Sequence, residues 1–339
     1  MSRGIGAFRS IQEVVPEWMA VVIALITQLG DGWFLLLMLS VLYWTQVEQQ
    51  DEILLVSGVL ACGVGLYRGL KFLFALPRPE QTLLDPELLP WLVRPLYELT
   101  GFATGFGFPS GHATGATIAY FGLATVLTWS TPRRRFVAAG TIVALVCFSR
   151  VALGVHYLVD TVVGVALGGL LLVISFRGIE RVRGDRVSLV FALAIALNLF
   201  YVYTSDLHVE AVTMLGVSMG IFGSWQLVVF AREVVADRRP SRESFPLVVR
   251  LALAALALVP LIAAAEEFDL YEVEPIPVGG MVGLAVGAIV LVPIGRHSAN
   301  VRRGLRVLSF WVDAILVSVR GLWRRAVEHL RGVWHRAFQ

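Results

Sequence analysis

The chain is organised around one segment, SRVALGVHYLVD at residues 149–160, whose polar side chains lie between two long apolar runs. Charged groups at membrane depth are costly, and they usually face a cavity or a partner. His156 and Asp160 are four residues apart and would share one face of a helix. The carboxylate could then hold one imidazole nitrogen and leave the other free to attack or to accept a proton. Arg150 offers a planar set of donors suited to phosphate. The structural alternative is a salt-bridged cluster that closes a helical hairpin.

The composition indicates an integral membrane protein. Hydrophobic residues make up 57% of the chain and charged residues 16%, whereas soluble domains contain about 25% charged residues. The two cysteines, Cys62 and Cys147, lie singly in apolar runs, so we interpret both as core residues. Residues 1–15 lack a basic start followed by an apolar core, so no cleavable signal peptide is expected. A net charge of +3 gives no reason to expect a nucleic-acid partner.

Nine apolar runs predict an all-α, polytopic fold, since a spanning helix needs about 20 mostly apolar residues. The runs cover residues 30–45, 53–75, 113–129, 136–155, 157–176, 187–203, 211–230, 247–265 and 278–294. The segment Gly30-Asp31-Gly32 interrupts the first apolar region. We therefore interpret residues 18–29 as a lead-in helix lying against the surface, and a single helix over 16–44 is the alternative.

The loops between the runs alternate in charge, and this alternation predicts the topology. Arginines fill the loops near residues 133–135, 177–186 and 232–242, whereas the loops after Tyr203 and Ala265 contain acidic residues and no Lys or Arg. Arginine-rich loops face the cytoplasm. We therefore expect a multi-pass protein of the cell membrane with its N-terminus outside and its C-terminus cytoplasmic. The basic residues and histidines of the candidate site would then lie near the outer face.

Four regions follow from these patterns: a lead-in segment at 1–29, a core at 30–176, additional spans at 187–294, and a tail at 301–339. The first additional span, 187–203, could complete the core. The tail has apolar residues at near-helical spacing among several arginines, which is typical of a basic amphipathic helix on anionic lipid. Docking of that helix on the protein's own cytoplasmic face is the alternative.

Two further clusters precede residues 149–160. The first is KFLFALPRP at 71–79, in which Lys71 is the chain's only lysine and Arg78 follows seven residues later. Basic residues just beyond a span are often interface anchors. The second cluster, Ser110-Gly111-His112, would begin a helix whose free N–H groups can bind an anion. An ordinary capped helix start with an interfacial histidine is the alternative for this cluster.

In this order and spacing, the three clusters resemble the signature of the type-2 phosphatidic acid phosphatase superfamily. That superfamily includes membrane lipid phosphatases, glucose-6-phosphatase and haloperoxidases. The resemblance covers about residues 30–176 of this chain. It implies a six-helix-type phosphatase core, to which this chain would add about three C-terminal spans. By resemblance, His156 is the nucleophile that forms a phosphohistidine, Asp160 holds its tautomer, and His112 is the general acid and base. Phosphate would be bound by Lys71, Arg78, Ser110, Gly111 and Arg150.

No metal or other cofactor is expected, because the fixed cations can neutralise the phosphoryl oxygens. A site at the outer end of spanning helices favours a lipid phosphate or a polyprenyl diphosphate, with the bilayer as the other partner. A soluble sugar phosphate and phosphotransfer to an alcohol acceptor are the alternative reactions, and a transporter or structural membrane protein is the non-enzymatic alternative. The sequence leaves open the oligomeric state, the exact substrate and the role of the loop at 80–108.

Overall fold

The computed structural model describes residues 19–79, 104–180, 185–236, 244–266 and 274–297, together with residues 94, 97, 306, 317, 318 and 325. Within these residues all regular structure is helical, as the composition predicted. The predicted tail helix over 301–339 and the loop at 80–108 lie mostly outside the described residues.

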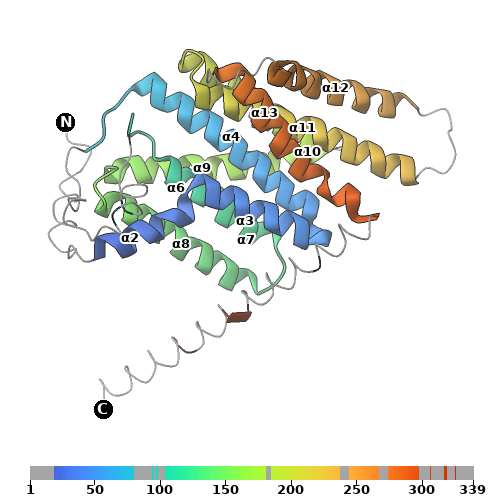
Figure 1. Cartoon of the computed structure of the whole chain (residues 1–339). Helices are drawn as coiled ribbons and strands as arrows, with labels where there is room; N and C mark the ends of the chain where they lie inside the picture. Colours follow the sequence, from blue (N-terminus) through green and yellow to red (C-terminus); the bar gives the residue numbers. More distant parts are fainter. Residues whose placement is uncertain are drawn as a thin grey trace.

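Helices follow one another along the whole described chain (Figure 1). They are α2 (Ala20–Thr27), η2 (Gln28–Gly30), α3 (Gly32–Thr45), η3 (Val47–Gln49), α4 (Gln50–Phe74), α6 (Gly111–Ala116), the π-helical η5 (Thr117–Phe121), α7 (Gly122–Val126), α8 (Pro132–Ala152), α9 (Leu158–Glu180), α10 (Arg186–Thr204), α11 (Val209–Ala236), α12 (Ser244–Glu266), α13 (Pro275–Leu291) and η6 (Val292–His297). Each of the nine predicted apolar runs is therefore helical.

Seven of the described helices are long and apolar enough to cross a membrane, and an eighth span results if α2 and α3 count as one bent span. The remaining run, from α6 through η5 to α7, covers only residues 111–126. That length is shorter than the ~20 residues of an ordinary span.

Residues 20–45 form two helices that meet at an angle of 51°, so the alternative of one long helix is wrong. The N-terminal helix α2 buries Ala20, Ile23 and Ala24 against residues at the end of α8, whereas Val22 on its other face is 47% exposed. One side of α2 therefore packs on the core. At the break, Gly30 is buried, Asp31 is partly exposed and Gly32 is exposed.

Helix α4 runs through the middle of the described helices and contacts α3, α9 and α10 (Figure 1). Helices α11, α12 and α13 pack on one another beside α10. At the end of the bundle where α4 begins, Arg232 of α11 pairs with Asp51 of α4 at 2.9 Å, and Arg186 of α10 pairs with Glu52. The three C-terminal helices are thus connected to α4 both directly and through α10.

Helices α11 and α13 approach each other closely because glycines face each other across their interface. A Cβ atom at Gly220 would lie less than 3 Å from backbone atoms of Gly283, and a Cβ at Gly283 would meet the backbone of Gly216. Small residues at membrane helix interfaces allow this kind of backbone contact. The packing therefore leaves no room for a side chain at these positions.

Replacing Gly220 with leucine is expected to destabilise the protein by about 1–3 kcal/mol or more, since overpacking forces the two backbones apart. The matched control is Gly169→Leu in α9, where an added Cβ meets no atom within 4 Å. Thermal unfolding in detergent measures both variants. A Gly220→Leu protein that unfolds at the same temperature as the control would contradict the close packing of α11 on α13.

Candidate active site

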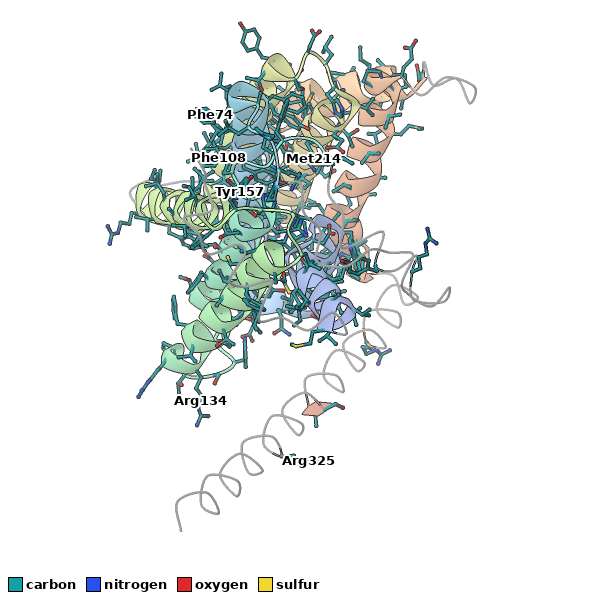
Figure 2. All side chains as sticks on the ribbon, turned by 90° about the vertical axis from the view of Figure 1, so that its left-hand side faces the viewer. Phe74, Phe108, Arg134, Tyr157, Met214 and Arg325 are labelled. Atoms are coloured by element: carbon teal, nitrogen blue, oxygen red, sulfur yellow. The ribbon has the colours of Figure 1, made fainter. Side chains whose placement is uncertain are left out.

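Three segments that are distant in sequence meet at one end of the bundle: the end of α4, the start of α6 and the connection between α8 and α9. Ser110 donates its backbone N–H to the carbonyl of Asp160 at 3.0 Å. Arg78 Nη1 lies 2.8 Å from the carbonyl of Val155 and 3.2 Å from His156 Nε2. Figure 2 shows Phe74, Phe108 and Tyr157, which flank these segments, far from Arg134 at the other end of α8. The structure thus brings the three predicted clusters together.

His156 lies in the tight connection between α8 and α9, and its side chain is almost fully buried. Gly154 has a φ of +75°, a conformation that suits glycine. The backbone N–H groups of Val155 and His156 both donate to the carbonyl of Arg150 at 3.2 Å. The sequence-based premise that His156 shares a helix with Asp160 is wrong, because α9 begins only at Leu158. The turn brings the two side chains together instead.

The imidazole of His156 has a carboxylate on one side and a guanidinium on the other. Its Nδ1 lies 3.5 Å from Asp160 Oδ2, which also accepts the backbone N–H of Tyr157 at 3.0 Å. Its Nε2 faces Arg78. Burial lowers the pKa of His156 well below 6.5, and the nearby cations Arg150, Lys71 and Arg78 lower it further. Its buried, cation-rich surroundings therefore favour the neutral form of the ring.

Arg78 is held in place by main-chain carbonyl groups. Its Nε lies 3.2 Å from the carbonyl oxygen of Thr104 and 3.1 Å from that of Gly105. Burial lowers the pKa of Arg78 to about 10, so the guanidinium stays charged at neutral pH. A fork of donors fixed in this way is suited to binding an oxyanion.

Lys71 and Arg150 supply two further buried cations. Lys71 is 8% exposed and donates to the carbonyl of Phe106 at 2.9 Å. Arg150 is 3% exposed and donates to the hydroxyl of Thr27 at 3.0 Å. Within the described part of the chain, no carboxylate lies within 4.0 Å of the cationic nitrogens of Lys71, Arg78 or Arg150. Three basic side chains are thus concentrated where they could bind an anionic group.

The start of α6 completes the cluster. Ser110 is the N-cap residue, and its Oγ accepts the N–H of Ala113 at 3.4 Å. A Cβ at Gly111 would lie 2.5 Å from the ring of Tyr67, so only glycine fits there. The next residue, His112, has its Nε2 3.8 Å from Asp31 Oδ2. Every predicted site residue therefore lies at this end of the bundle.

Sequence reasoning missed four neighbours of the site: Thr27, Asp31, Tyr67 and Arg68. Arg68 lies one turn before Lys71 on α4, and its Nη1 pairs with Glu210 of α11 at 2.6 Å. The spacing of three residues from Lys71 was a signal that could have identified Arg68. Thr27 and Asp31 carried no such signal, because only the bend between α2 and α3 places them here.

No three His, Cys, Asp or Glu side chains are grouped as metal ligands in the described ranges. Independence from metal ions stays a prediction, to be tested with a chelator.

The comparisons with known proteins concern the part of the chain that holds these residues. Residues 52–183 match the family model of the PAP2 superfamily. Phosphatidylglycerophosphatase B of Bacillus subtilis (strain 168) is 36% identical over 106 residues, which are 29% of this chain and 52% of that protein. The match thus spans about half the length of this curated relative.

A solved structure is also similar, the transmembrane PAP2 type phosphatidylglycerolphosphate phosphatase from Bacillus subtilis. It has 26% sequence identity and a TM-score of 0.41, and the match covers 52% of this chain and 87% of that one. The family model begins at Glu52 in α4 and ends just after α9, and so includes all the predicted site residues. This chain is a multi-pass membrane protein whose residues 52–183, which hold the candidate site, match the PAP2 superfamily.

Proposed function

We propose that this protein is a membrane phosphatase that hydrolyses a lipid phosphate or a polyprenyl diphosphate through a phosphohistidine, without a metal ion. One observation carries the proposal: two histidines, a carboxylate and three buried cations from separate segments converge at one end of the helical bundle. The basic side chains outnumber the carboxylates among the described residues of this cluster, and an excess of positive charge is suited to binding a phosphate group. The similarity to a phosphatidylglycerophosphatase supports the same reaction class.

In the proposed mechanism, His156 Nε2 attacks phosphorus in line while Asp160 holds the Nδ1 side of the ring. The N–P bond forms as the bond to the leaving oxygen breaks, and His112 gives that oxygen a proton. His112 then takes a proton from water, the water oxygen attacks phosphorus, and the N–P bond breaks. Lys71, Arg78 and Arg150, with Ser110 and the Gly111 amide, hold the equatorial oxygens.

An amphiphilic substrate fits the surroundings of the site. Leu73 and Phe74, just before Arg78, are 60% and 49% exposed on the apolar surface of the bundle. The rings of Phe74 and Phe108 are 5.6 Å apart. A phosphate could therefore enter beside Arg78 while its hydrocarbon chain remains in the bilayer.

We further propose that the site opens on the extracytoplasmic side. Arg133, Arg134 and Arg135 begin α8, whereas Arg150 lies near its end. A helix of 21 residues is about 31 Å long, enough to separate the two groups by a bilayer core. If the arginine-rich loop faces the cytoplasm, the site faces outside and the C-terminus is cytoplasmic.

The test is phosphate release by purified protein in detergent with EDTA, on phosphatidylglycerophosphate, phosphatidate, a polyprenyl diphosphate and a hexose phosphate. We expect hydrolysis of the lipid substrates to continue at full rate with the chelator. Preference for the hexose phosphate would favour a soluble substrate, and transfer to an added alcohol would indicate a phosphotransferase. Release of no phosphate from any substrate would reject the phosphatase and leave a transport or structural role.

The pH profile tests the state of His156. Because the nucleophile must be unprotonated and its pKa is lowered, we expect the acidic limb of kcat/KM to lie below pH 6.5. Activity is lost as the pH falls through that limb. Arg78→Ala removes a neighbouring cation, which raises the pKa of His156 and moves the limb to higher pH. An acidic limb above pH 6.5 in the unmodified protein would contradict the assignment.

A further inference from the structure

The bend between α2 and α3 brings a second carboxylate to the site. Asp31 is the N-cap residue of α3, with an extended backbone (φ −77°, ψ 144°). An aspartate at this position usually accepts an N–H group of the first turn. Here the Asp31 side chain makes no capping hydrogen bond. Its Oδ2 lies 3.8 Å from His112 Nε2, a buried atom without a hydrogen-bond partner among the described residues.

The position of Asp31 is fixed by packing on the helix that carries His112. Tyr120, two turns after His112, donates its hydroxyl to the carbonyl of Leu29 at 2.7 Å. A Cβ at Gly30 would lie 3.4 Å from the Cβ and the ring of His112, and 2.6 Å from Val146. The backbone just before Asp31 is therefore in contact with the histidine, and a larger residue at Gly30 would push the bend away.

We infer that Asp31 is a positioning residue for His112, in parallel with Asp160 and His156; this inference rests on the proposed phosphatase function. The two pairs have similar geometry, with carboxylate-to-imidazole distances of 3.8 Å and 3.5 Å. His112 must hold a proton among several cations before it gives that proton to the leaving oxygen. A carboxylate next to Nε2 stabilises the protonated ring and fixes its orientation.

The same bend also contacts a phosphate-binding residue. Thr27, one turn before Asp31, accepts a hydrogen bond from Arg150 at 3.0 Å. The interruption of the first span therefore supports both the candidate acid and one of the cations. If residues 27–32 formed one continuous helix, Asp31 would lose its extended backbone. Its carboxylate would then no longer be directed toward His112.

The test separates a role in proton donation from a role in folding. Asp31→Asn keeps the size and N-capping ability of the side chain but removes its charge. We compare phosphatidate, whose alkoxide leaving group needs a proton, with p-nitrophenyl phosphate, whose phenolate leaves readily. We expect kcat to fall about 30-fold on phosphatidate and less than about 3-fold on p-nitrophenyl phosphate, because general acid catalysis contributes roughly 10²–10⁴-fold in all.

The control is Glu48→Gln, an exposed carboxylate beyond the far end of α3, which should leave both rates unchanged. Asp31→Glu keeps the charge and should retain more of the phosphatidate rate than Asp31→Asn. Equal losses on the two substrates, or no loss on either, would overturn the inference. If Asp31→Asn does not fold, Asp31→Ser, which can also cap α3, is judged by the same ratio of rates. An unmodified protein that releases no phosphate from these substrates or from a polyprenyl diphosphate would instead reject the proposed function.

Discussion

Replacing His156 with alanine is expected to lower kcat by at least about 10⁴-fold, the order of loss seen when an enzyme nucleophile is removed. The variant has no nitrogen at the position that faces Arg78 at 3.2 Å, so no phosphohistidine can form. The unmodified protein is mixed with ³²P-labelled substrate, and the reaction is stopped rapidly without acid. We expect ³²P to remain covalently bound to the protein. The same treatment of His156→Ala should trap none.

The matched control is His297→Ala, since His297 ends η6, beyond α13. This variant should keep the full rate and the full trapped label. Substantial turnover by a folded His156→Ala protein would remove His156 as the nucleophile. Label that remains on the His156→Ala variant would assign the covalent step to another residue.

Replacing Arg78 with alanine is expected to lower kcat/KM by about 10²–10³-fold, because it removes a fixed donor that would face the phosphoryl oxygens. Arg78→Lys keeps the charge but cannot bond the carbonyls of Thr104, Gly105 and Val155 in the same way. We expect a loss of about 10-fold or more for the lysine variant, since a compact ammonium does not replace a planar fork.

Steady-state kinetics on the preferred lipid phosphate measure both variants, with Arg134→Ala as the control. Arg134 is exposed at the opposite end of α8 (Figure 2), and its loss should not change the rate. A rise in KM with kcat unchanged would show that Arg78 binds the substrate and the transition state equally well. Full activity of Arg78→Ala would exclude this residue from the phosphate site.

The positions of the helices and of the three polar clusters could be predicted from the sequence. Runs of apolar residues predict helices because a bilayer requires the backbone to satisfy its own hydrogen bonds, and all nine runs are helical. The three polar clusters stood out because charge is costly beside such runs. Their resemblance to one family, now supported by the match over residues 52–183, gave the candidate residues before any distance was known.

The tertiary structure determined which side chains meet. Periodicity predicted a shared helix for His156 and Asp160, yet a glycine turn before α9 brings them together. Thr27 and Asp31 reach the site only because the first span bends by 51°. The ion pair of Arg68 with Glu210 joins α4 to α11 across more than 140 positions in the sequence. The physical reason is that periodicity reports the face of one helix, whereas the neighbours of that face depend on how the whole bundle packs.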